Sequence, residues 1–262
     1  MIESPGNPGD SFEVPHVPLR IRQPDRGYRF SIDSVLLAGF AAPHCRGDVL
    51  DLGTGCGVLL LLLSRLAPGM RSGTGIEIQG ELCAFGVGNF RENGLERRLR
   101  VAEGDFRQDV PGVPRGGFDL VVANPPFGRM GRGRRNPDPV KEAARHEVSS
   151  TLQELFAAAG RHLGPGGRFA LVLPRERLQE ILSCARREGM ACETLRCVHA
   201  RKDAPPSRVL ALMNRGAGGV PTGMPPLFLH EGEGKYCPEV ERICRLFRPV
   251  SGALPGQPRD GG

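Results

Sequence analysis

Residues 49–57 read Val49-Leu50-Asp51-Leu52-Gly53-Thr54-Gly55-Cys56-Gly57, and an apolar segment, 58–66, follows them. The first part is typical of a buried strand, the glycines of a tight turn, and the apolar segment of a helix. Glycine lets the backbone turn sharply and approach a ligand closely, and the N-terminus of a helix offers free N–H groups. This strand, turn and helix predict the nucleotide-binding start of an α/β fold.

The spacing of the glycines narrows the ligand. Gly53, Gly55 and Gly57 follow a G-x-G-x-G pattern, and Val58 stands where G-x-G-x-x-G has its third glycine. A dinucleotide pyrophosphate normally requires that glycine, so the pattern disfavours NAD and a dehydrogenase and favours a nucleoside ligand without phosphates. We expect the turn to hold this ligand, with Asp51 beside its ammonium group or a bound water. A glycine turn without a ligand is the alternative.

Acidic residues also stand at the ends of two further expected strands. The strand at 72–78 contains Glu77, about 20 residues after the glycine turn, where an acid is expected to accept from the two ribose hydroxyls. The strand at 99–103 leads to Asp105 and Phe106. We expect Asp105 to accept from an adenine amino group and Phe106 to pack against the ring. The alternatives are a solvated glutamate and a simple turn aspartate.

The strand expected at 118–123 stops at the corner Asn124-Pro125-Pro126-Phe127. Two prolines fix φ, remove two backbone donors and hold the preceding residue extended. The corner therefore displays an amide oxygen, backbone carbonyls and an aromatic ring at the carboxyl end of a strand, where open α/β sheets bind ligands. Such a set suits a planar amino group on a flat ring. The alternative is a proline-terminated strand whose Asn caps a turn and whose Phe joins the core.

Strands and helices alternate along the remaining chain. The other expected helices are 31–42, 81–93, 150–163, 176–188 and 236–247, and the other strands are 168–173, 192–198, 208–213 and a small one at 227–230. The pattern predicts an α/β, Rossmann-like, mostly parallel sheet with helices on both faces and an antiparallel strand at or near one edge. We expect an irregular N-terminal arm at 1–22, one domain at 23–247 and a flexible tail at 248–262.

Charge points to a polyanionic partner. The 262 residues include 35 Lys and Arg against 29 Asp and Glu, a formal net charge of +6, and the pI is near 9.1. Arginine suits phosphate and stacks on bases, although a genome rich in G and C is an equal explanation. Two basic segments, the loop 128–139 and the turn 201–206, are candidates to contact an RNA backbone, with a solvated loop as the alternative. Their candidate residues are Arg129, Arg132, Arg134, Arg135, Arg201 and Lys202.

Several classes of protein are disfavoured by what the sequence lacks. The 8 cysteines form no Cys-x-x-Cys pair and no Cys/His spacing of a zinc module, so we expect reduced thiols and no metal. His146 is expected to be structural. The N-terminus has no signal-peptide pattern, and the longest apolar run, 58–63, is far shorter than the roughly 20 residues that span a bilayer. We expect a cytoplasmic monomer or weak homodimer without a membrane partner.

With these motifs in order, the chain resembles the class I S-adenosylmethionine-dependent methyltransferases that methylate amino groups. From about Gln23 to Phe247 it resembles the bacterial tRNA adenine-N6 methyltransferases that modify the anticodon-loop adenine of valine tRNA. The more specific similarity lies in residues 27–37, 144–147 and 236–240. One departure is Phe127, where tyrosine is commoner in that family, and another is the long arginine loop.

The resemblance implies a seven-stranded sheet, S-adenosylmethionine as cofactor and tRNA as substrate. The cofactor is then expected across residues 51–57, with its ribose at Glu77 and its adenine near Asp105. Phe127 would stack on a target base taken out of its stack, while Asn124 and the Pro125 carbonyl would accept the two amino hydrogens; Pro126 completes the corner. Neither a metal nor a covalent intermediate is required.

Three rival functions remain open. A protein-glutamine N5-methyltransferase uses a similar corner, but that class carries a helical N-terminal domain, which the irregular start of this chain disfavours. An rRNA guanine or adenine amino-methyltransferase is also possible, although no duplicated domain is visible. The third is an RNA-binding module with a degenerate methyltransferase fold, against which the intact corner and glycine turn speak.

Overall fold

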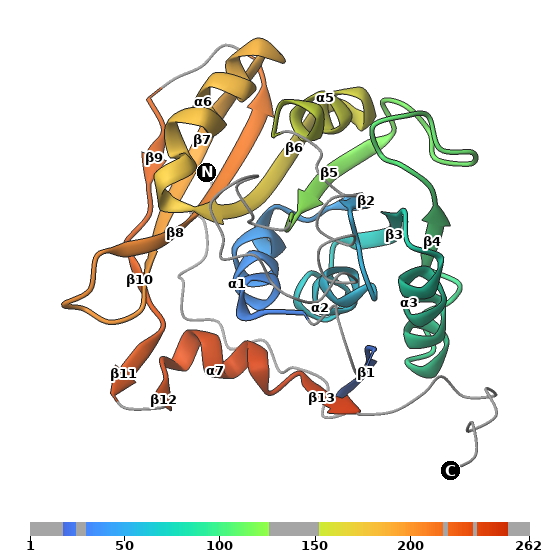
Figure 1. Ribbon diagram of the computed structural model, residues 1–262, viewed down its shortest axis with the longest axis horizontal. Helices are drawn as coiled ribbons and strands as arrows, with labels where there is room; N and C mark the ends of the chain where they lie inside the picture. The colour runs from blue at the N-terminus through green and yellow to red at the C-terminus, as the bar shows by residue number, and fades with distance from the viewer. Residues whose placement is uncertain (1–17, 25–29, 126–151, 217–219, 233–234, 251–262) are drawn as a thin grey trace, which may run out of the picture.

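The structure, a computed structural model, describes residues 18–24, 30–125, 152–216, 220–232 and 235–250. In this part of the chain a central sheet of nine strands runs in the order β10-β7-β8-β6-β5-β2-β3-β4, with β9 beside β7 (Figure 1). Its longer strands are β2 (Gly47–Leu52), β3 (Met70–Glu77), β4 (Leu99–Glu103), β5 (Phe118–Ala123), β6 (Leu163–Pro174), β7 (Met190–His199) and β8 (Pro206–Arg215). These are the expected seven, and β9 (Thr222–Gly223) and β10 (Leu227–Phe228) extend the β7 edge.

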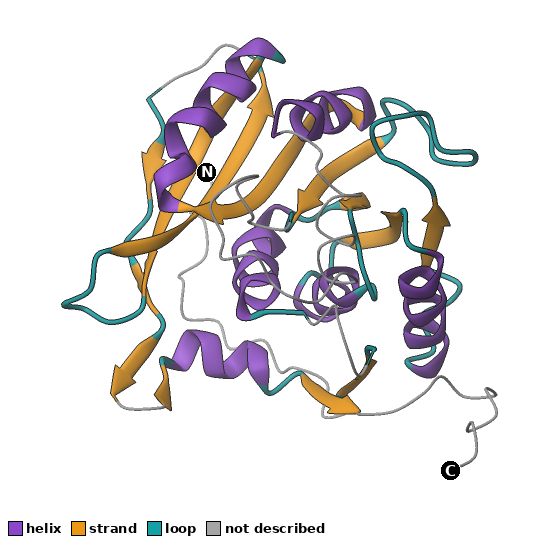
Figure 2. Ribbon diagram, viewed as in Figure 1, coloured by secondary structure: helices purple, strands orange, loops and turns teal. Residues whose placement is uncertain are grey.

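Helices cover both faces of this sheet, as expected for a Rossmann-like fold (Figure 2). The helices are α1 (Ile32–Ala41), α2 (Val58–Leu66), α3 (Gly80–Glu92), α5 (Leu152–His162), α6 (Leu178–Arg187) and α7 (Pro238–Cys244), with 3-10 turns at Ala42–His44 and Arg175–Arg177. Buried residues of α1, α2, α3 and α7 form one hydrophobic cluster. Those of α5 and α6 form another. The molecule therefore has three layers around two cores.

The central strand β5 shows why the sheet is stable between these layers. Leu120 and Val122 belong to the first cluster, whereas Val121 and Ala123 belong to the second, and all four are 0 % exposed. Successive side chains of a strand point to opposite faces, so a continuous apolar run is required where both faces are covered. This is the pattern that predicted β5 from the sequence.

Strand direction brings the ends of four strands to one edge. β2 pairs in parallel with both β3 and β5, and β3 pairs in parallel with β4, with Glu77 opposite Glu103. The strand β8 is antiparallel to β6 and to β7, which confirms the expected hairpin. Because β2, β3, β4 and β5 run the same way, the residues at their carboxyl ends meet at the same edge of the sheet.

Strands also occur in the segments expected to be an irregular arm and a flexible tail. β1 (Leu19–Arg22) pairs in parallel with β13 (Phe247–Val250), from Leu19 opposite Phe247 to Arg22 opposite Val250. The helix expected at 236–247 is shorter, because Tyr236 belongs to β12 (Lys235–Tyr236), which pairs with β11 (His230–Gly232), and Pro238 takes the start of α7. Proline suits that first position since it lacks an N–H that would be unpaired there.

Candidate active site

The glycine turn between β2 and α2 has the geometry that glycine alone adopts readily. Gly53, Gly55 and Gly57 have φ of 75°, 57° and 76°, in the left-handed region that favours glycine. A Cβ added at Gly57 would lie 2.6 Å from the Phe90 ring, so α3 packs directly against the turn. A Cβ at Gly53 would meet nothing within 4 Å. The turn is therefore supported from behind and has open space in front of Gly53.

Five hydrogen bonds fix this turn against the end of β3. The N–H groups of Gly53 and Thr54 both donate to the Ile76 carbonyl, at 2.9 and 3.0 Å, and the Gly57 N–H donates to the Thr54 carbonyl at 3.0 Å. The Thr54 hydroxyl donates to Asp51 at 2.7 Å. The Gly55 N–H donates to the Glu77 carboxylate at 2.9 Å. Two of the predicted ligand-binding acids thus also organise the turn.

Asp51 and Glu77 are buried carboxyl groups at the ends of neighbouring strands, 2 % and 6 % exposed. Burial raises the pKa of Asp51 to about 7, against the hydrogen bond from Thr54, and the charge of Glu77 raises it further. Burial also raises the pKa of Glu77, opposed by N–H donors that include Gln79 and Gly55. Two buried acids side by side favour a ligand that carries positive charge or hydroxyl donors.

The raised pKa of Asp51 gives a testable dependence of stability on pH. The folded protein keeps a proton on Asp51 up to about pH 7, whereas the unfolded chain loses it near 3.8. This contribution is therefore fully present below pH 3.8 and is lost as pH rises through about 7, an effect on the order of 4 kcal/mol. Urea unfolding of the ligand-free protein at pH 5 and pH 8 measures it. Asp51→Asn should show a smaller fall, and an identical fall in both proteins would contradict the assignment.

Asp105 and Phe106 follow β4 on the same edge. Asp105 accepts from the backbone N–H of Arg107 at 2.9 Å and from its guanidinium at 2.8 Å, and these bonds lower its pKa. Phe106 is 9 % exposed and belongs to the second hydrophobic cluster. The expected adenine contact of Asp105 would share its carboxylate with Arg107, and the ring of Phe106 lies largely in the core.

Asn124 follows β5 and is half-buried. Its amide nitrogen donates to the hydroxyl of Ser34 in α1 at 2.9 Å, and Ser34 itself is 4 % exposed. An amide whose nitrogen is engaged leaves its oxygen as the group to present. Among the described residues, no donor meets that oxygen. Ser34 and Asn124 are separated by 90 residues, so local sequence patterns gave no signal for this contact.

Pro125 is half-buried beside Asn124. The rest of the predicted corner, Pro126 and Phe127, lies outside the described residues, as does His146. The candidate RNA residues of the loop 128–139 also lie outside them; these are Arg129, Arg132, Arg134 and Arg135.

The other two candidate RNA residues lie in the turn between β7 and β8. Arg201 and Lys202 are exposed and border a cleft of about 550 Å³ whose lining includes Phe228 and His230. Since β7 runs parallel to β5, the turn lies on the same sheet edge as Asn124. It is three strand steps away, roughly 14 Å along the sheet.

Within the described ranges, no group of three or more His, Cys, Asp or Glu could hold a metal ion, and no helix there is long and apolar enough to cross a membrane. All eight cysteines are free. The cysteine of the glycine turn, Cys56, has its thiol pKa raised to about 12 by burial. A thiol this weakly acidic makes a poor nucleophile at neutral pH.

Comparison with known proteins places these features among methyltransferases. The sequence profile described as "Methyltransferase small domain" matches residues 30–184. A protein of Porphyromonas gingivalis named tRNA1(Val) (adenine(37)-N6)-methyltransferase is 30% identical over 85% of this chain and 89% of its own. A protein of the same name from Aeromonas salmonicida is 31% identical over 93% of this chain and 97% of its own.

Solved structures show the same fold at lower identity. A "predicted O-methyltransferase" from Agrobacterium tumefaciens superposes with a TM-score of 0.64 at 19% identity, covering 84% of this chain and 99% of its own. A geranyl diphosphate C-methyltransferase from Streptomyces coelicolor, solved with S-adenosyl-L-homocysteine, gives a TM-score of 0.51 at 15% identity, covering 69% of this chain and 76% of its own.

Proposed function

The chain belongs to the methyltransferase small domain family, and we propose that it transfers a methyl group from S-adenosylmethionine to N6 of an adenine in tRNA. The finer substrate we propose is the anticodon-loop adenine of valine tRNA. Support comes from the two relatives named as tRNA1(Val) adenine-N6 methyltransferases. The observation that carries the proposal is the Asn124 amide, held at the sheet edge by Ser34 with its oxygen left to accept.

The cofactor fits the residues at this edge. The open space in front of Gly53 leaves room for a ligand against the turn, and the buried acids Asp51 and Glu77 favour a cationic ligand with hydroxyl groups. We propose that the turn and Asp51 hold the methionine part, that Glu77 accepts from the ribose and that Asp105 and Phe106 lie beside the adenine. When bound, the cofactor supplies an electrophilic methyl group on a positively charged sulfur.

The protein's part in the reaction is positioning and electrostatics. An adenine amine donates its lone pair into the ring and is a weak nucleophile. The Asn124 oxygen and the Pro125 carbonyl would accept its two hydrogens, so that the lone pair faces the methyl carbon. The new N–C bond forms as the C–S bond breaks, and a proton then leaves the nitrogen. Preorganised acceptors of this kind are worth most in a site that excludes water.

The direct test is transfer of labelled methyl from S-adenosylmethionine to unmodified bulk tRNA, followed by nucleoside analysis. We expect label in N6-methyladenosine, and in valine tRNA once the species are separated. A valine tRNA whose anticodon-loop adenine is replaced by guanine should stay unlabelled. Cofactor binding without label in tRNA would overturn the substrate and direct the search to ribosomal RNA, then to protein glutamine.

We also propose that Arg201 and Lys202 contact the RNA backbone, because both are exposed cations on the edge that presents Asn124. Replacing both by alanine should raise KM for tRNA several-fold and reduce the dependence of binding on salt by about two charges. Cofactor affinity should not change. Arg97→Ala is the matched control, because Arg97 is an exposed arginine at the amino end of β4, on the opposite edge. Equal effects of the two changes would contradict an RNA contact at the turn.

A further inference from the structure

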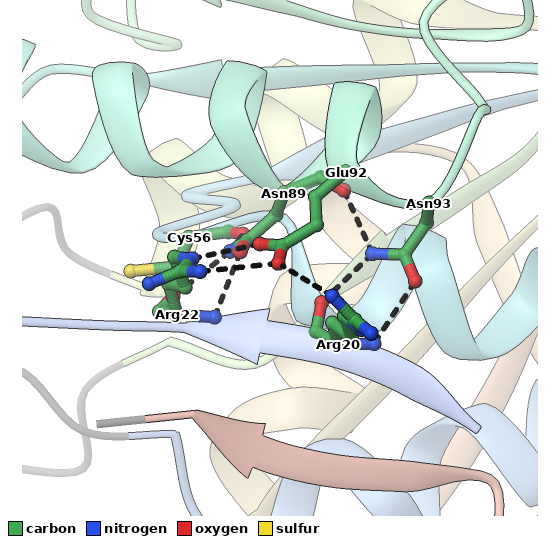
Figure 3. Close-up of polar contacts among 6 residues, drawn as sticks. All are labelled: Arg20, Arg22, Cys56, Asn89, Glu92 and Asn93. Carbon is green, nitrogen blue, oxygen red and sulfur yellow. Dashed lines mark hydrogen bonds and ion pairs between the residues drawn. The ribbon is translucent and has the colours of Figure 1, made fainter. Parts of the chain in front are cut away.

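Asn89 is a fully buried amide in α3, 0 % exposed, and it joins two separate parts of the chain (Figure 3). Its oxygen accepts from the Arg22 N–H of β1 at 2.8 Å. Its nitrogen donates to the Arg22 carbonyl at 2.9 Å and to the carbonyl of Cys56, in the glycine turn, also at 2.9 Å. Both amide hydrogens are therefore used, one on β1 and one on the turn.

Asn93, one helical turn later, holds β1 in the same way. Its oxygen accepts from the Arg20 N–H at 2.9 Å and its nitrogen donates to the Arg20 carbonyl at 2.7 Å. Residues four apart share a helix face, and alternate residues of a strand present their backbone groups to the same side. The two asparagines thus stand in for a neighbouring strand along one edge of β1, while β13 pairs with β1 as well.

The two asparagines differ in where their remaining hydrogen goes. That of Asn93 returns to the carbonyl of Asn89 within α3, at 2.8 Å, whereas that of Asn89 reaches Cys56. The Cys56 carbonyl belongs to the peptide that precedes Gly57, the left-handed residue at the start of α2. Fixing this carbonyl fixes the plane of the peptide and, with it, the path of the turn. The pair Asn89 and Asn93 therefore separates support of β1 from support of the turn.

We propose that Asn89 is a positioning residue for the cofactor, acting through the Cys56 carbonyl and coupling the glycine turn to strand β1. The ion pair of Arg22 with Glu92 in α3, with an N–O distance of 2.7 Å, strengthens the same attachment. Without Asn89 the turn loses the donor to its Cys56 carbonyl, and cofactor binding must then order the turn at a cost in affinity. This inference rests on the proposed function for the identity of the ligand.

The test compares Asn89→Ala with Asn93→Ala in calorimetric titrations with S-adenosylmethionine, well below the melting temperature of each variant. Each change removes the two bonds to a residue of β1, so both should lower the melting temperature by several degrees. Only Asn89→Ala should raise Kd, by about tenfold, and its KM for the cofactor should rise in parallel while kcat stays within about twofold. Equal Kd values for the two variants, or a wild-type Kd in Asn89→Ala, would overturn the proposal.

A second variant keeps the test valid if Asn89→Ala does not fold. In Asn89→Asp the side chain has the same shape and can still accept from the Arg22 N–H, but an ionised carboxylate has no hydrogen for Cys56. Its Kd should also rise about tenfold, and an unchanged Kd would overturn the proposal. If the wild-type protein does not bind S-adenosylmethionine, the proposed function fails, and the inference fails with it. Wild-type binding with an unaffected Asn89 variant refutes the inference alone.

Discussion

Replacing Asn124 by alanine is expected to lower kcat for methyl transfer by on the order of 10³-fold, the cost of losing one preorganised group that acts in the transition state. Kd for S-adenosylmethionine should stay within about twofold of wild type, because Asn124 lies after β5, whereas the proposed cofactor contacts follow β2, β3 and β4. Single-turnover methylation of tRNA measures the first quantity and calorimetry the second. A wild-type rate would exclude Asn124 as the acceptor of the amino hydrogens.

Two neighbouring changes separate the role of the amide oxygen from that of its placement. Asn124→Asp keeps an acceptor of the same shape and should retain more activity than Asn124→Ala. Ser34→Ala removes the partner of the amide nitrogen but leaves the oxygen in place, so its loss of kcat should be smaller than that of Asn124→Ala. If Ser34→Ala were as damaging as Asn124→Ala, the hydroxyl of Ser34 would itself be required at the reacting amine.

The sequence predicted those parts of the fold that depend on local pattern. The continuous apolar run 118–123 indicated a strand covered on both faces, and β5 has those bounds. The glycines of the turn predicted a positive φ at Gly53, Gly55 and Gly57, and all three show it. These features follow from the chain's own covalent geometry and from burial, so one sequence is sufficient to find them.

Contacts between distant segments were not predictable in this way. Leu19-Arg20-Ile21-Arg22 alternates apolar and basic residues, which is typical of a strand, but nothing local indicates pairing with residues 247–250. The same holds for Asn89, whose partners lie 67 and 33 residues away. In the sequence it is one polar residue on a helix, and only the packing of α3 against the turn shows that it is fully buried.

Glu77→Gln is expected to raise Kd for S-adenosylmethionine by about 100-fold or more. The Glu77 carboxylate accepts from the N–H groups of Gly55 and Gln79, at 2.9 and 3.0 Å, and a carboxylate has further lone pairs, which we propose for the ribose hydroxyls. Glutamine has the same shape, but its NH₂ group cannot accept. It would either face one of these backbone donors or turn towards the ribose, so one set of bonds is lost.

The size of this effect should not come from unfolding. Burial raises the pKa of Glu77, which means that its charge is costly in the ligand-free protein, and a neutral glutamine offsets part of the bonds it loses. We therefore expect a melting temperature within a few degrees of wild type. The control is Glu103→Gln, because Glu103 lies opposite Glu77 in β4 but is exposed. Calorimetry should give a wild-type Kd for Glu103→Gln, and similar losses in both variants would mean that Glu77 acts through the charge of the sheet edge and makes no specific contact with the ribose.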